Sequence, residues 1–267
     1  MGMRFQILGS SSGGNCALLQ TEETAVLIDA GFSARRIEAM LEPTGLALSD
    51  IEAVFLTHEH SDHIAGLPGL SRHRHLRFFA NAQTASAART KLKRDVTWRI
   101  FETGQTFRFA GLSVETLALP HDAYDPVAFV IRSGGEDLFN PPRCLAWVTD
   151  LGYVPSALPA RIADADTLVL EANHDLELLD MDMKRPFSVK QRIRGRHGHL
   201  SNEAAHTFLQ SARLPRLERL FLAHLSRDCN CTDRVAARFP RETFPFAVEI
   251  IDPGETVPLS PTWTLAS

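Results

Sequence analysis

Short runs of apolar residues recur along the chain at strand length. Polar or turn-forming residues bound each run, which is typical of strands buried in a folded core. The runs that we expect to form strands are Phe5–Leu8, Ala25–Ile28, Ala53–Leu56, Val114–Leu119, Val127–Ile131, Leu145–Val148, Leu168–Leu170, Leu220–Leu222 and Ala247–Ile251.

Helical patterns alternate with these strand runs. Ser33 is a candidate N-cap, because apolar residues follow it at helical spacing between Ile37 and Leu41. Alanine-rich segments predict further helices over Thr84–Leu92 and Glu203–Leu214. Many strands combined with a few helices predict an α/β or α+β layered architecture.

Composition agrees with a globular protein. Of 267 residues, 44% are hydrophobic and 22% are charged, and 28 basic against 32 acidic residues leave a formal net charge of −4. Without repeats, low-complexity tracts or linkers, we expect a single domain over residues 1–267. The chain lacks the roughly 18 consecutive apolar residues of a membrane helix. Met1–Ser10 lacks the basic, then apolar, then small-residue order of a signal peptide. Four cysteines in a chain of this length make no disulfide framework. We therefore expect a cytoplasmic protein without membrane contact; its oligomeric state is not indicated.

Eleven histidines are present, and several have metal-ligand spacing. His58, His60, Asp62 and His63 follow the run Ala53–Leu56. Residues two apart in an extended chain share a face, and a turn can redirect the residues after it. Imidazole nitrogens with a carboxylate suit zinc-like ions. A polar surface turn explains a lone His-x-His but not this longer motif.

Three further candidate ligands occupy the same kind of position. His121, Asp150 and His224 each follow a predicted strand within three residues. Strand ends often meet at one edge of a sheet, where ligands bind in α/β folds. Together the seven residues are enough for two metal ions.

The order of these seven residues resembles the metallo-β-lactamase-fold hydrolase superfamily, from about Met3 to about Ile251. The resemblance implies an αβ/βα sandwich of two mixed sheets with helices on the outer faces. It also implies two divalent metal ions, and such ligands accept Zn, Mn or Fe. The implied ligands are His58, His60 and His121 for one metal, Asp62, His63 and His224 for the other, and Asp150 as the bridge.

Additional segments resemble the YycJ (WalJ) group of this superfamily. They are Gly9–Cys16, Thr149–Gly152, Glu171–Asp175, Gly198–Asn202 and His224–Asn230. Asp228 and Cys229 stand where the group is expected to have a Glu-Asn or similar pair. The group is similar to DNA exonucleases and, more distantly, to tRNase Z and small-molecule phosphodiesterases. The resemblance implies 5′–3′ exonuclease-like activity on DNA.

The resemblance also implies catalytic roles. In the tRNase Z relatives a similar histidine and glutamate help to protonate the leaving group, so His199 is implied as general acid and Glu171 as its orienting partner. Asp62, besides ligating a metal, is expected to orient the attacking hydroxide. The glycine-rich segment Ser10–Asn15 is most simply a hairpin turn, and the alternative is that Asn15 lines the cleft and contacts substrate.

A locally basic segment suits a phosphate chain. Residues 183–202 contain six Lys and Arg and no acidic residue, although the whole chain is acidic. Lys190, Arg192 and Arg194 are therefore candidates for contacting DNA, while a merely solvated loop is the alternative.

These observations favour a dinuclear-metal phosphodiesterase, most simply a nuclease acting on DNA. Alternatives are a small-molecule phosphodiesterase, a glyoxalase II-like thioester or lactone hydrolase, and a non-enzymatic scaffold. The basic segment argues against the thioester and lactone chemistry. The intact ligand set argues against a scaffold.

Overall fold

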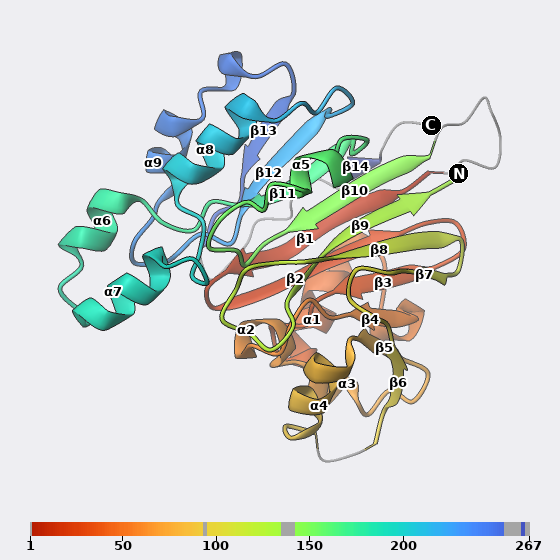
Figure 1. Ribbon diagram of the computed structural model, residues 1–267. Coiled ribbons are helices and arrows are strands. Elements are labelled where there is room, and N and C mark those ends of the chain that lie inside the picture. Colours follow the sequence, from red (N-terminus) through yellow and green to blue (C-terminus); the bar gives the residue numbers. More distant parts are fainter. Residues whose placement is uncertain (1, 93–94, 135–141, 254–262, 265–267) are drawn as a thin grey trace.

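Two mixed β-sheets lie face to face in the computed structural model, which describes residues 2–92, 95–134, 142–253 and 263–264 (Figure 1). In spatial order, the described strands of the first sheet are β14 (Trp263–Thr264), β1 (Arg4–Ser11), β2 (Gly14–Gln20), β3 (Ala25–Ile28), β4 (Ala53–Phe55), β5 (Arg77–Ala80) and β6 (Thr97–Ile100). Those of the second are β13 (Ala247–Ile250), β12 (Arg219–Ala223), β11 (Thr167–Glu171), β10 (Arg143–Val148), β9 (Val127–Ser133), β8 (Leu112–Ala118) and β7 (Thr106–Phe109). Strands β3 to β6 and β10 to β13 run parallel, and the other pairs are antiparallel.

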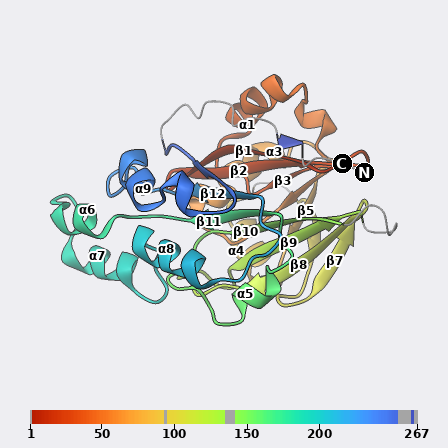
Figure 2. The same cartoon turned by 90° about the horizontal axis from the view of Figure 1, so that it is seen from above.

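Helices cover the outer faces of the two sheets. Figure 2 shows α1 on one side of the stacked sheets and α5 and α8 on the other. The helices are α1 (Ala34–Leu41), α2 (Ser61–Ile64), α3 (Leu67–Leu70), α4 (Ala82–Arg89), α5 (Leu158–Arg161), α6 (Leu176–Met181), α7 (Phe187–Arg194), α8 (Asn202–Ser211) and α9 (Thr232–Arg238). Short 3₁₀ turns occupy Glu42–Thr44, Leu48–Asp50 and Arg241–Thr243.

The alternation of side chains along the strands produces three apolar layers. In β10, Leu145 and Trp147 pack between the sheets, whereas Ala146 and Val148 pack under the helices of the second sheet. This follows from the period of two in a strand, because a strand covered on both faces buries every residue. The ring of Trp147 meets that of Phe5 from the opposite sheet edge to face, at 6.1 Å between centroids. The layers therefore run helix, sheet, sheet, helix.

The expected αβ/βα sandwich is confirmed, and every predicted strand run overlaps an observed strand. The Ser33 N-cap is also present, since its hydroxyl accepts a hydrogen bond from the Arg36 amide. The apolar-run criterion missed β2, β5 and β14 as well as β6 and β7. Of these, β6 and β7 lie at sheet edges and are largely exposed. Edge strands alternate polar and apolar residues, so they contain no continuous apolar run.

Candidate metal centre

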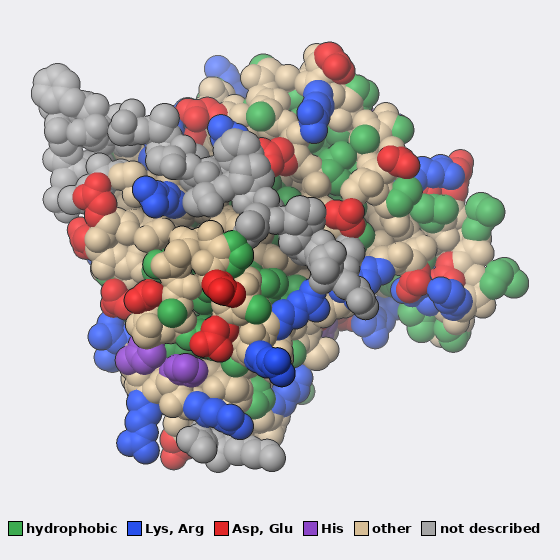
Figure 3. All heavy atoms as spheres, turned by 180° about the vertical axis from the view of Figure 1, so that it is seen from behind, with side chains coloured by type: hydrophobic (Ala, Val, Ile, Leu, Met, Phe, Trp, Pro, Cys, Tyr) green, Lys and Arg blue, Asp and Glu red, His purple; other side chains and the backbone are tan. Residues whose placement is uncertain are grey.

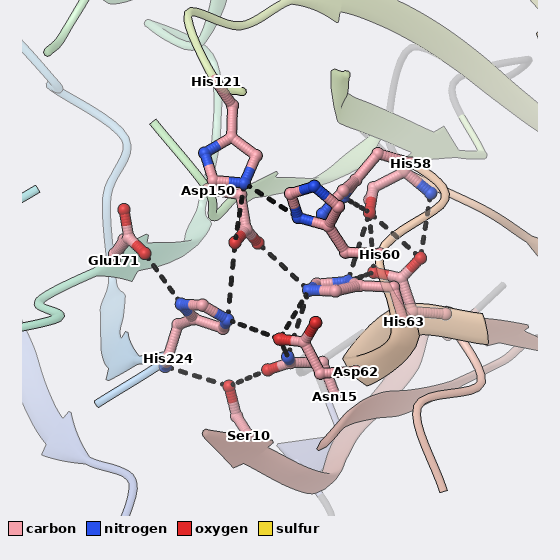
Figure 4. Close-up of polar contacts among 12 residues, drawn as sticks. Ser10, Asn15, His58, His60, Asp62, His63, His121, Asp150, Glu171 and His224 are labelled. Carbon is pink, nitrogen blue, oxygen red and sulfur yellow. Dashed lines mark hydrogen bonds and ion pairs between the residues drawn. The ribbon is translucent and has the colours of Figure 1, made fainter. Parts of the chain in front are cut away.

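The seven predicted ligands come together where strands of both sheets end (Figure 4). The first sheet contributes the motif after β4, of which Asp62 and His63 lie in the short helix α2. The second sheet contributes the residues after β8, β10 and β12: His121, Asp150 and His224. The fold thus joins residues that are up to 166 positions apart, from 58 to 224.

His58, His60 and His121 form the first group of candidate ligands, with ligand atoms within 4.8 Å of one another. Hydrogen bonds occupy the Nδ1 atoms of two of these rings: Thr57 Oγ1 lies 3.0 Å from His58 Nδ1, and the Gly198 carbonyl lies 2.9 Å from His121 Nδ1. His58 Nε2 is buried without a hydrogen-bond partner. Such an orphaned nitrogen between two other imidazoles fits a metal ion.

Asp62, His63 and His224 form the second group, also with ligand atoms within 4.8 Å. Asp62 Oδ2 lies 3.5 Å from His63 Nε2 and 3.4 Å from His224 Nε2. One carboxylate oxygen therefore faces two ring nitrogens, which is a donor set that suits a divalent cation.

Asp150 lies between the two groups. Its Oδ2 atom is 3.3 Å from His63 Nε2 and its Oδ1 atom is 3.7 Å from His121 Nε2. Oδ2 is buried and makes no hydrogen bond. Oδ1 also lies 3.4 Å from His224 Nε2, so the carboxylate is within reach of ring nitrogens of both groups, which suits a shared ligand.

Backbone strain accompanies these positions. Asp29, Asp150 and His224 have φ values of 59°, 64° and 56°. Such left-handed conformations are uncommon for residues other than glycine, and they persist where the surrounding structure imposes them. Here they turn the chain sharply at strand ends and direct side chains toward the centre.

Burial and neighbouring charges lower the pKa of two rings of the first group, His58 and His121. Burial lowers the pKa of His58 well below its ordinary value, and the charges of His63, His121 and His60 lower it further. The pKa of His121 is also lowered, again mainly by burial. Neutral imidazole is the form that binds metals, so these rings are ready to act as ligands.

Carboxylates surround the imidazoles of the second group. Burial alone lowers the pKa of His224, but Asp150, Asp62 and Glu171 outweigh it and raise the pKa to about 10. Burial likewise raises the pKa of Asp62, yet His63 and His224 hold it below the ordinary range. Buried ionised carboxylates need compensating positive charge, which a divalent cation supplies.

Several supporting residues were not predicted from the sequence. Asp29 Oδ2 lies 2.8 Å from His63 Nδ1, and Asp29 also accepts hydrogen bonds from the Thr57 amide and hydroxyl. Ser10 Oγ accepts a hydrogen bond from the His224 amide. Asp29 directly follows β3. A search for polar residues at the ends of predicted strands, which selected Asp150, could therefore also have selected Asp29. Partners of this kind fix the orientation of a ligating imidazole.

Glu171 and His199 lie beside the second group. Glu171 is fully buried at the end of β11, and its Oε1 atom lies 2.8 Å from His199 Nδ1 and 2.7 Å from His224 Nδ1. Its Oε2 atom accepts hydrogen bonds from the Leu151 and Leu200 amides. Burial lowers the pKa of His199, but Glu171 outweighs burial and the net shift is upward.

Asn15 is fully buried beneath the ligands. The hairpin of β1 and β2 places its Nδ2 atom 3.1 Å from His63 Nε2 and 3.4 Å from Asp62 Oδ2, and its Oδ1 accepts from Ser10. The structure therefore brings Asn15 into contact with ligands and leaves it no surface for a polynucleotide.

Helix α7 carries the three basic candidates and projects from the sandwich together with α6 (Figure 1). From behind, Lys and Arg side chains lie next to Asp and Glu side chains on the surface (Figure 3). Arg192 Nε lies 2.8 Å from Asp122 Oδ2. Lys190 Nζ donates to the Asp180 carbonyl, and Arg194 contacts the Asp180 carboxylate. The two arginines are thus paired with aspartates that lie outside the basic segment, although 68% of the Arg192 side chain is exposed.

The fold and this donor set define a class: the chain belongs to the β-lactamase superfamily, whose domain model matches residues 24–225. It is 36% identical to exodeoxyribonuclease YycJ of Bacillus anthracis, over 86% of this chain and 85% of that protein. It is 32% identical to exodeoxyribonuclease WalJ of Streptococcus pneumoniae, over 86% and 84%. The structure of the metallo-β-lactamase-fold protein YhfI from Bacillus subtilis superposes with a TM-score of 0.72 at 17% identity, covering 99% of this chain and all of the other.

Among the described residues, none of the helices has both the length and the apolar character needed to span a lipid bilayer.

Proposed function

We propose that this protein is a dinuclear-metal phosphodiesterase that hydrolyses DNA, as a 5′–3′ exonuclease. One observation carries the proposal: two groups of mostly buried nitrogen and oxygen donors converge with Asp150 between them. The exodeoxyribonuclease names of two relatives that match most of the chain support the substrate class. A cytoplasmic location fits this activity.

The donor set indicates which residues would hold each ion. His58, His60 and His121 would bind one ion, Asp62, His63 and His224 the other, and Asp150 both. Zn, Mn and Fe all suit these donors. Bound there, divalent ions would polarise the phosphodiester and activate a water molecule for attack.

The protein's own residues would handle protons and orientation. Glu171 holds Nδ1 of His199, so Nε2 of that ring is the atom available to donate a proton to the departing oxygen. The upward shift in the His199 pKa favours the protonated ring that this role needs. Asp62 would orient the nucleophile, while the hydrogen bonds of Asn15 would hold Asp62 in place.

DNA would be held by surfaces beside the centre. Arg192 contacts Asp122, which directly follows the candidate ligand His121, so α7 adjoins the site. We propose that Arg192 and Arg194 exchange their acidic partners, and Lys190 its carbonyl partner, for phosphates when DNA binds.

The alternative substrates are a small phosphodiester and a thioester. One set of assays that compares the rates on DNA and on these substrates decides among them. Metal-loaded protein is assayed against end-labelled single- and double-stranded DNA, RNA, bis-p-nitrophenyl phosphate and a thioester, with elemental analysis of the same samples. We expect two metal ions per chain and the highest kcat/KM on DNA, and we expect Asp150→Ala to lose metal and activity together. Full activity with one metal per chain, or a preference for the thioester, would contradict the proposal.

A further inference from the structure

The chain contains only two tyrosines, and each closely follows a candidate metal ligand in the sequence. Tyr124 is three residues after His121, and Tyr153 is three residues after Asp150. Their residues are 70% and 38% exposed. Exposed aromatic rings beside a site for phosphate chemistry are placed to stack on bases.

The Tyr124 ring projects from a well-anchored loop. The Tyr124 amide donates a hydrogen bond of 2.9 Å to Glu59 Oε1. The next residue, Asp125, accepts hydrogen bonds from Asn81 through its carbonyl and from Thr103 through its carboxylate. These contacts fix the backbone, so the ring is presented to solvent without the entropic cost of ordering a loop on binding.

A groove of about 580 Å³ opens beside this ring. Tyr124 and Glu59 line it, together with residues of α4 and the segment after it: Gln83, Ser86, Ala87, Thr90 and Lys91. Glu59 stands between His58 and His60 in the sequence, so its backbone connects the groove to the first group of ligands, although none of the candidate ligands lines the groove. Its volume lies within the range of ordinary ligand pockets, and its lining combines an aromatic face, polar groups and one lysine.

We propose that Tyr124 is the stacking platform for an unpaired nucleobase next to the scissile phosphate, and that the α4 groove receives that nucleotide. The inference rests on the proposed phosphodiesterase function and adds the substrate class: a single-stranded end whose base is unstacked. Stacking tolerates any base, since every base has a π-face, as a nuclease without sequence preference requires.

Tyr153 is the matched comparison within the same chain. The Arg196 guanidinium lies over its ring, 4.5 Å from the centroid, so one face is already covered. We therefore assign the platform to Tyr124 alone.

The test is binding of metal-loaded protein to a short oligothymidylate that carries 2-aminopurine at one end and phosphorothioate linkages to slow cleavage. Wild-type protein should quench the 2-aminopurine fluorescence. Tyr124→Ala should weaken binding about 5- to 150-fold, as removal of one stacked base does, and should abolish the quench. Tyr124→Phe should restore both, and Tyr153→Ala should bind within threefold of wild type. The metal content of Tyr124→Ala should equal that of wild type, and its salt dependence of binding should be unchanged, because the variant keeps every basic side chain that can neutralise a phosphate.

Two outcomes would overturn the platform: Tyr124→Ala binding as tightly as wild type with an intact quench, or Tyr153→Ala losing as much affinity as Tyr124→Ala. The proposed function is tested by cleavage, independently of the binding measured for the platform. If wild-type protein cleaves no phosphodiester while the Tyr124-dependent quench persists, the catalytic proposal is wrong and the base subsite stands. If DNA is cleaved and Tyr124→Ala is indistinguishable from wild type in cleavage and binding, only the subsite is wrong.

Discussion

Glu171 illustrates how single residues set the chemistry of this centre. One of its oxygens meets both His224, a candidate ligand, and His199, a ring that belongs to neither three-residue ligand group. The other oxygen is held by two backbone amides. Because both oxygens are engaged, the carboxylate is rigid, and it positions the two imidazoles relative to each other.

Replacing His199 by alanine tests its role as general acid. We expect kcat on DNA to fall by about 10²–10⁴-fold, which is the usual contribution of a positioned proton donor. The effect should shrink on bis-p-nitrophenyl phosphate, because p-nitrophenolate departs without a proton. His197→Ala is the matched control, since His197 is an exposed histidine two residues away.

Metal content decides between the possible roles of His199. If the variant loses metal, His199 is a ligand. An equal fall in rate on both leaving groups would make it a positioning residue instead.

At the scale of elements, α7 is attached to its surroundings by charge and little by apolar packing. None of its residues is buried, and its basic side chains contact Asp122 and Asp180. Exposed ion pairs contribute little to stability, so they can be exchanged for phosphates at small cost.

A triple variant should weaken polynucleotide binding when alanine replaces Lys190, Arg192 and Arg194. The slope of log K against log salt concentration should fall by roughly 0.7–0.9 for each phosphate that the variant no longer neutralises. Binding is measured across salt concentrations from about 50 to about 200 mM. A charge-matched control is alanine at Arg213, Arg238 and Arg241, which are exposed and precede β12 and β13, at the edge away from the ligands. If hydrolysis of a small phosphodiester falls as far as hydrolysis of DNA, α7 supports the structure of the centre and does not bind substrate.

At the scale of the molecule, the centre joins the two sheets. The motif after β4 belongs to one sheet, and His121, Asp150 and His224 belong to the other. Ions bound between them would cross-link the two sheets of the sandwich beyond their shared apolar layer. Such ions bind the folded chain and hardly bind the unfolded one, so they should raise stability.

Metal addition should therefore raise the melting temperature. At a free metal concentration of about 100 Kd, one site adds about 2.7 kcal/mol, which corresponds to roughly 5–10 °C for a domain of this size. Differential scanning calorimetry with and without a chelator measures the shift. The melting temperature of Asp150→Ala should rise little when metal is added. If metal does not change the melting temperature of wild-type protein, the centre does not link the two sheets.

Local patterns were sufficient to predict a layered α/β or α+β architecture and to select the seven residues that the structure gathers at one edge, whereas the αβ/βα sandwich was implied by the resemblance to a known superfamily. An apolar run fills a buried strand, and a polar residue at its end has few places to point except the sheet edge. Both statements concern neighbours in sequence, so they can be made without coordinates.

Tertiary structure decided the rest, because it depends on residues that approach from distant parts of the chain. The sequence left open whether Asn15 belongs to a simple hairpin turn or lines the cleft at the substrate; the β1–β2 hairpin turns its amide toward Asp62 and His63. The basic run at Lys190–Arg194 contains no acidic residue, yet the fold places Asp122 and Asp180 next to it. Tyr124 lies on a loop whose exposure depends on contacts with Glu59, Asn81 and Thr103. Packing and pairing between distant segments, which no local period encodes, determine where these side chains point.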